Sequence, residues 1–100
     1  MNEKKYYVYI ITNTNNTVLY IGVTGNLRKR LYEHKNKLDE ESFASQNNLI
    51  KLVHFEEYDD SNRAIAREKQ LKHWNRKWKE RLIRKSNPYW RDLSENLDFE

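Results

Sequence analysis

The two glycines of this chain, Gly22 and Gly25, lie together where a strand-like segment passes into a basic helical one. Residues 17–23 are rich in β-branched and aromatic side chains and predict a strand, whereas residues 27–37 carry leucines at helical spacing. Asn26, between the two, is a favoured helix N-cap. The stretch 20–34 therefore requires a half-buried strand that turns directly into a helix, with Gly22 allowing another group to approach the strand backbone.

Two polar side chains of this helix occupy positions where apolar ones would pack better. With Leu27 at zero, Leu31 falls at about 40°, His34 at about −20° and Arg30 at about −60° around the helix axis. His34 thus lies within the apolar stripe and Arg30 at its edge, which indicates a site that handles phosphate. The alternatives are an arginine on an ordinary solvated basic helix and a histidine that is simply hydrogen-bonded.

Upstream, residues 5–12 predict the first strand, and the run 13–16 (Asn-Thr-Asn-Asn) predicts a tight turn. A symmetric hairpin centred between Thr14 and Asn15 sets the register of the two strands. The predicted pairs are Ile11 with Val18, Ile10 with Leu19 and Tyr9 with Tyr20. This register places two tyrosine hydroxyls side by side on one face, either as part of a site or as core aromatics whose hydroxyls reach the surface.

Downstream, the pattern predicts a loop, a strand and two helices. Residues 38–48 are polar and acidic around Phe43, and residues 49–58 are apolar on both faces, as a central strand is. Asp59, Asp60 and Ser61 provide a cap for a helix that runs to about Trp74. A second helix at 76–85 stops at Ser86-Asn87-Pro88, after which residues 89–93 pack back on the body.

Glu68 lies inside the buried arc of the helix after residue 61, at about 40° from Ala64. A carboxylate among apolar side chains requires a partner. Either it forms a structural ion pair, with Arg30 or Lys72, or it binds Mg²⁺ or Mn²⁺, which accept one carboxylate when waters and phosphate oxygens complete the octahedron.

The charge of the chain is unevenly distributed. Its net charge is only +4, but residues 38–60 hold seven acids against one lysine, whereas residues 63–91 hold eleven bases against two acids. The second half is therefore a candidate polyanion-binding surface, although a solvated basic helix with core tryptophans has the same composition. The proposed nucleic-acid contacts are Lys69, Lys72, Arg76, Lys77 and Arg84.

The composition also excludes several classes of protein. The chain contains no cysteine, which rules out disulfides and thiolate-based zinc or redox sites. No apolar run approaches the roughly 20 residues that a membrane span needs. We therefore expect a cytoplasmic protein without a membrane partner.

The motifs of this chain resemble those of the GIY-YIG nucleases over about residues 5–93, most closely those of small stand-alone bacterial members described as predicted endonucleases. Tyr7-Val8-Tyr9 stands at the first motif, with Tyr7 in the place of its glycine, and Tyr20-Ile21-Gly22 stands at the second. The further matching residues are Arg30, His34, Glu68 within Arg67-Glu68-Lys69-Gln70-Leu71-Lys72, and Asn87 within Asn87-Pro88-Tyr89-Trp90.

The resemblance implies an α+β fold, a small three-stranded antiparallel sheet flanked by helices, in a domain at residues 1–93. The acidic residues 94–100 that follow are expected to form a frayed tail. It also implies one-metal hydrolysis of phosphodiester bonds, with Glu68 holding Mg²⁺ or Mn²⁺ and Tyr9, ahead of Tyr20, as the base. Tyr20 and His34 would position water and phosphate, Arg30 would neutralise the transition-state charge, and Asn87 would brace the site.

The expected activity is that of a DNA endonuclease acting on branched, nicked or damaged DNA in repair or recombination. Most characterised relatives take target choice from an appended domain, so this chain would bind DNA weakly, depend on a partner protein, or recognise branched or nicked structure rather than sequence. The runner-up is a non-catalytic nucleic-acid-binding module with the same fold. A third interpretation is an interaction protein whose charge serves solubility.

Overall fold

The computed structural model describes residues 4–36 and 47–96, with side chains up to Glu95. Most of the loop expected at 38–48, including Phe43, and the last four residues of the expected tail lie outside this part. The elements, in chain order, are β1 (Tyr6–Thr12), β2 (Leu19–Thr24), α1 (Leu27–Lys35), β3 (Lys51–Tyr58), α3 (Ser61–His73), α4 (Arg76–Ser86) and a 3₁₀ turn, η1 (Leu93–Asn96). The tail thus begins within an ordered turn.

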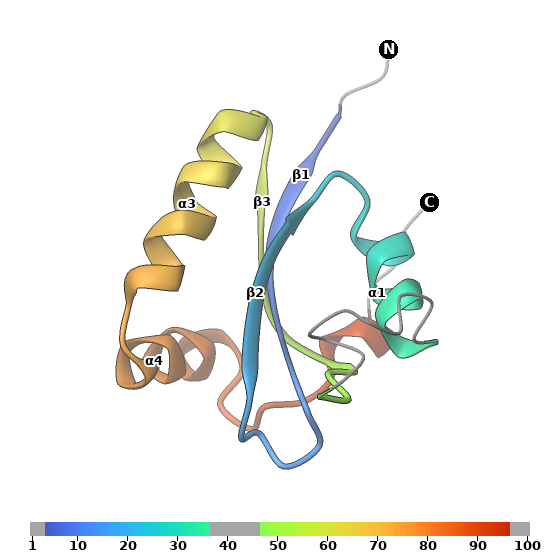
Figure 1. Ribbon diagram of the computed structural model, residues 1–100, viewed down its shortest axis with the longest axis vertical. Helices are drawn as coiled ribbons and strands as arrows, with labels where there is room; N and C mark the ends of the chain where they lie inside the picture. Colours follow the sequence, from blue (N-terminus) through green and yellow to red (C-terminus); the bar gives the residue numbers. More distant parts are fainter. Residues whose placement is uncertain (1–3, 37–46, 97–100) are drawn as a thin grey trace.

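The three strands form one antiparallel sheet in the order β2-β1-β3, so β1 is the central strand. Figure 1 shows α1 on one face of this sheet and α3 with α4 on the other. This arrangement confirms the α+β prediction of a small three-stranded antiparallel sheet flanked by helices. Within the described residues, no helix is long and apolar enough to cross a bilayer.

Alternation along the strands gives the sheet a separate core on each face. The α1 face buries Tyr9, Ile11, Leu27, Leu31, Leu49 and Leu52. The α3–α4 face buries Val8, Ile10, Ile21, Val53, Ala64, Leu71, Ile83 and Trp90. Neighbouring residues of β1 therefore serve opposite cores, and Tyr9 belongs to the α1 side.

The predicted hairpin register was wrong by two residues. In the structure Ile11 pairs with Tyr20 and Tyr9 pairs with Gly22. The reason is the side chain of Asn13, whose Oδ1 accepts from the backbone N–H groups of Thr17 (2.9 Å) and Val18 (3.1 Å). These bonds hold a longer connection in place of a two-residue turn. Because the shift is an even number of residues, Tyr9 and Tyr20 still share a face, diagonally rather than directly opposed.

Strand β3 contains a bulge that the C-terminal segment supports. Ile10 pairs with His54 and Ile11 with Leu52, so Val53 is the extra residue. The Val53 carbonyl accepts a hydrogen bond from Asn87 Nδ2 at 3.1 Å, and the Leu52 amide donates to Asp92 Oδ1 at 3.1 Å. The segment after α4 is thereby attached to the irregular part of β3.

Local capping explains where the helices begin. Asn26 accepts from the amide of Lys29 and caps α1, and Asp60 accepts from the amide of Asn62 and caps α3, as the sequence predicted. Asn75 caps α4 in the same way through Trp78. The turn into α1 thus places His34 and Arg30 at fixed angles over the sheet.

Candidate active site

Three aromatic rings meet on the α1 face of the sheet. Tyr9 comes from the middle of β1, Tyr20 from β2 and His34 from the last turn of α1. The Tyr9 hydroxyl lies 3.2 Å from His34 Nε2, and the ring centroids of Tyr9 and Tyr20 are 6.3 Å apart. The centroid of Tyr20 lies 6.1 Å from that of His34. The two tyrosines and the histidine expected at the site are therefore in mutual contact.

Gly22 makes room for this cluster. It pairs with Tyr9 across the sheet, and a Cβ at residue 22 would lie 2.5 Å from both Cζ and the hydroxyl oxygen of Tyr9. Its φ is not in the left-handed region, so space rather than backbone freedom requires glycine here. The group expected to approach this backbone is thus the Tyr9 ring itself.

Arg30 lies at the solvent side of the cluster. Its side chain is 35% exposed and pairs with Glu33 at 3.2 Å, three residues on along α1. Contact with the Tyr9 hydroxyl raises the pKa of Arg30 above its usual value. A hollow beside the guanidinium is lined by Lys4, Thr24, Gly25, Asn26, Lys29, Arg30 and Glu33.

The sequence interpretation missed three of these lining residues. Lys29 and Lys4 add positive charge beside Arg30, and Glu33 fixes the guanidinium from the same helix face. The spacing of Arg30 and Glu33, three residues apart on a helix, was the available signal for the pair. Lys4 is brought to the site by strand pairing, for which no local signal exists.

Burial keeps both hydrogen-bonded partners of the cluster neutral. Tyr9 is 1% exposed and His34 is 4% exposed. Burial raises the pKa of Tyr9, against the opposing effect of the nearby Arg30 guanidinium. Burial, reinforced by the positive charge of Arg30, lowers the pKa of His34 to about 4. At neutral pH the pair is a phenol and an uncharged imidazole.

Glu68 lies on α3, which covers the face of the sheet opposite α1 (Figure 1). Its side chain is 15% exposed and pairs with Lys72 at 2.9 Å, one of the two partners the sequence offered. Lys72 lines a hollow along β2 together with Tyr20 and Lys79. Tyr20 therefore borders both the aromatic cluster and the surface next to Glu68.

A metal ion held by Glu68 would have a single carboxylate of the described residues among its ligands. Across residues 4–36 and 47–96, no three His, Asp or Glu side chains gather into a metal-binding group. Glu68 already has a cation beside its largely buried carboxylate. Mg²⁺ needs only one or two protein carboxylates when phosphate oxygens and waters supply the remaining positions.

The side chain of Asn87 forms hydrogen bonds with backbone groups. Nδ2 donates to the carbonyls of Val53 (3.1 Å) and Arg91 (2.9 Å), and Oδ1 accepts from the Arg91 amide (3.0 Å). Val53 belongs to the core on the α3–α4 face. These contacts place Asn87 at the β3 bulge rather than against Tyr9 or His34.

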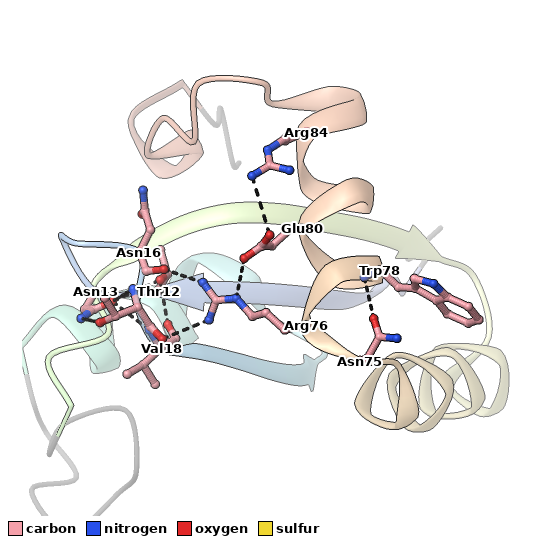
Figure 2. Close-up of polar contacts among 10 residues, drawn as sticks. Thr12, Asn13, Asn16, Val18, Asn75, Arg76, Trp78, Glu80 and Arg84 are labelled. Carbon is pink, nitrogen blue, oxygen red and sulfur yellow. Dashed lines mark hydrogen bonds and ion pairs between the residues drawn. The ribbon is translucent and has the colours of Figure 1, made fainter.

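The expected nucleic-acid contacts differ in how far their side chains are engaged with other groups of the protein. Lys69 and Lys77 are exposed, and Arg84 is 60% exposed at 3.7 Å from Glu80. Lys72 pairs with Glu68. Arg76 instead donates to the backbone carbonyls of Asn16 and Thr17 and pairs with Glu80 at 2.8 Å, which joins α4 to the β1–β2 connection (Figure 2).

Comparisons with known proteins cover most of this chain. A family model described as the GIY-YIG catalytic domain matches residues 5–81. A UPF0213 protein of Syntrophus aciditrophicus is 39% identical over 84% of this chain and 94% of its own length. A UPF0213 protein of Natronomonas pharaonis is 33% identical over 78% of this chain and 89% of its own.

A solved structure shares the fold. The solution NMR structure of a UPF0213 protein from Bacillus halodurans superimposes with a TM-score of 0.57 at 21% identity. The match covers 91% of this chain and 95% of that one. The same fold therefore extends over nearly the whole of both chains.

Proposed function

The chain belongs to the GIY-YIG nuclease family, and we propose on that basis that it is a divalent-metal-dependent DNA endonuclease. The observation that carries the proposal is the buried hydrogen bond between the Tyr9 hydroxyl and a neutral His34, with Arg30 beside it. A tyrosine that serves only the core would direct its hydroxyl to solvent, whereas the Tyr9 hydroxyl lies between the imidazole of His34 and the guanidinium of Arg30. We expect branched, nicked or damaged DNA as substrate, in cytoplasmic repair or recombination.

Tyr9 and His34 supply a route for the proton of the attacking water. The raised pKa of Tyr9 makes a preformed phenolate scarce at neutral pH. Neutral His34, with Nε2 unprotonated, accepts the hydrogen bond of the Tyr9 hydroxyl. The Tyr9 oxygen has two lone pairs, so beside the one that faces the Arg30 guanidinium it has another for a water molecule. As the water attacks phosphorus, its proton passes to the Tyr9 oxygen while the Tyr9 proton passes to His34 Nε2.

Arg30 supplies the charge complement to the phosphate. Its guanidinium adjoins the hollow that Lys4 and Lys29 also line, so a scissile phosphate there meets three cations. A guanidinium binds two phosphate oxygens at once, and its attraction grows as negative charge accumulates in the transition state. Tyr20, beside the same cluster, would orient the phosphate.

Glu68 would hold the metal ion, and Lys72 would release the carboxylate when the ion binds. An ion held by Glu68 would supply positive charge for the phosphate and the departing 3′ oxygen. DNA that passes around the β2 edge would contact Tyr20 and Glu68 together, because the hollow lined by Tyr20 and Lys72 lies there.

The test is incubation with nicked, flap and four-way DNA, with Mg²⁺ or with EDTA. Tyr9→Phe should reduce the cleavage rate by about 10²–10⁴-fold because it removes the proton carrier. Arg30→Ala should reduce it by about 10²–10³-fold through lost charge stabilisation. Glu68→Gln should abolish the response to Mg²⁺ while DNA binding persists.

Matched controls are Tyr89→Phe and Glu57→Gln, at exposed positions. Both should cleave at the parental rate. Cleavage that survives Glu68→Gln would overturn the metal assignment. Binding of all three substrates without cleavage of any would assign the chain to the non-catalytic binding modules instead.

A further inference from the structure

A groove of about 520 Å³ lies on α4, away from the aromatic cluster of the candidate active site. It is lined by Trp74, Trp78, Arg81, Leu82, Arg84 and Lys85. Trp78 leaves α4 on the side opposite Arg76 and Glu80 (Figure 2). It is 51% exposed, although tryptophan is normally well buried, because burying so large an apolar surface is favourable. An exposed tryptophan in a groove indicates a binding surface.

The fold holds Trp78 in a fixed orientation. Its ring meets that of Trp74 edge to face, at a centroid distance of 5.8 Å and an interplanar angle of 85°. Trp74 is held in turn by the Arg67 guanidinium, 5.1 Å from its ring. The Trp78 amide donates to the N-cap Asn75 at 2.9 Å. A ring held in this way loses little conformational entropy when a flat partner stacks on it.

The surroundings of the groove select an anionic partner. Arg81, Arg84 and Lys85 border it, and the residues 76–86 of α4 contain six bases against the single acid Glu80. An aromatic platform bordered by cations is the combination that binds single-stranded nucleic acid, because bases stack on the ring and phosphates meet the cations. A paired base inside a duplex cannot offer its face to Trp78.

We infer that this groove binds an unpaired DNA nucleotide, whose base stacks on Trp78 and whose phosphates contact Arg81 and Lys85. The inference rests on the proposed function and adds to it a preference for DNA with a single-stranded segment, such as a flap. Lys79 of the same helix lines a separate hollow, which it shares with Tyr20 and Lys72.

The experiment measures binding by fluorescence anisotropy in EDTA, so that cleavage plays no part. Labelled oligo-dT and a blunt duplex are titrated with the parental chain, Trp78→Ala and Trp78→Phe. Trp78→Ala should weaken oligo-dT binding roughly tenfold and duplex binding by less than about twofold. Trp78→Phe, which retains a stacking face, should keep most of the affinity. Tyr32→Ala, at another exposed aromatic (61%), should change neither.

The intrinsic fluorescence of the protein gives a second measurement. Oligo-dT should quench it in the parental chain and much less in Trp78→Phe, a variant that keeps the ring contact with Trp74. Equal losses for oligo-dT and duplex in Trp78→Ala, or no loss for either, would overturn the inference. Tighter, Trp78-dependent binding of an oligo-glutamate peptide would assign the groove to an acidic protein and overturn it as well.

The two proposals fail separately. If the parental chain cleaves flap DNA and Trp78→Ala leaves oligo-dT binding unchanged, the nuclease proposal stands and the groove assignment is wrong. If the chain binds oligo-dT through Trp78 and cleaves none of the substrates, the groove assignment stands and the nuclease proposal is wrong.

Discussion

Burial favours the neutral form of both Tyr9 and His34. Desolvation penalises the charged form of each group, which raises the pKa of the phenol and lowers that of the imidazole to about 4. A neutral donor and a neutral acceptor therefore form the stable pair in this buried position. The arrangement favours concerted proton movement through Tyr9 over a standing phenolate.

The lowered pKa of His34 predicts how stability depends on pH. The unfolded chain, with an ordinary histidine pKa of 6.5, binds the proton before the folded chain does. The free energy of unfolding is therefore not reduced by His34 above about pH 6.5. It falls by about 3 kcal/mol in total as the pH drops toward 4. Urea unfolding followed by circular dichroism between about pH 7 and pH 5 measures the first part of this loss.

His34→Gln is the matched variant for this measurement. Glutamine stays neutral throughout, so its unfolding free energy should change less over the same range. Glu56 has a pKa lowered to about 2 through its bonds with His54, Arg67 and Tyr58, despite burial that acts in the other direction. The stability that Glu56 contributes declines only as the pH falls below 4.5, which lies outside the range of the His34 measurement. Equal pH dependence in the parental chain and in His34→Gln would contradict the assignment.

At the scale of the elements, the bulge in β3 explains why the C-terminal segment is needed. A bulge leaves backbone groups without strand partners, and an unpaired buried carbonyl costs free energy. Asn87 bonds the Val53 carbonyl and Asp92 bonds the Leu52 amide, so two side chains beyond α4 complete the ladder. Trp90 then packs into the core on the α3–α4 face.

Asn87→Ala tests whether Asn87 acts on the fold or on the reaction. The substitution removes three hydrogen bonds to backbone atoms and leaves the Val53 carbonyl buried, so the unfolding free energy should fall by about 2 kcal/mol. Cleavage at a temperature where the variant is folded should stay within about threefold of the parental rate. Urea unfolding and flap cleavage provide the two measurements. Unchanged stability with cleavage lost would place Asn87 in the reaction itself.

Elements set by local periodicity and capping were predictable, whereas contacts set by distant side chains were not. Helical angles placed His34 and Arg30 toward the sheet, and Asn26 and Asp60 cap the helices as expected. The hairpin register depends on the bonds of the Asn13 side chain within its loop, which no propensity encodes. The hydrogen bonds from Arg76 to the carbonyls of Asn16 and Thr17 in the same loop could likewise not be predicted from the sequence.

At the scale of the whole molecule, the candidate groups lie on both faces of a thin sheet. Tyr9, His34 and Arg30 lie on the α1 side, whereas Glu68 and the basic α4 lie on the other (Figure 1). A substrate that passes the β2 edge would meet both, and Tyr20, Lys72 and Lys79 line a hollow there. The shape of the sheet thus predicts that DNA wraps an edge rather than entering a closed cleft.

Salt dependence of DNA binding separates the cations that contact phosphate from those that hold the fold. Lys77 and Arg76 are neighbours on α4, but Lys77 is exposed, whereas Arg76 bonds Asn16, Thr17 and Glu80. Lys77→Ala should reduce the slope of log affinity against log salt by about 1, because one counterion fewer is released. Arg76→Ala should leave that slope unchanged and lower the unfolding free energy by about 1 kcal/mol. Anisotropy titrations of a nicked duplex at several salt concentrations, paired with urea unfolding, measure both quantities. A reduced slope in Arg76→Ala with unchanged stability would show that its guanidinium leaves the loop to bind phosphate.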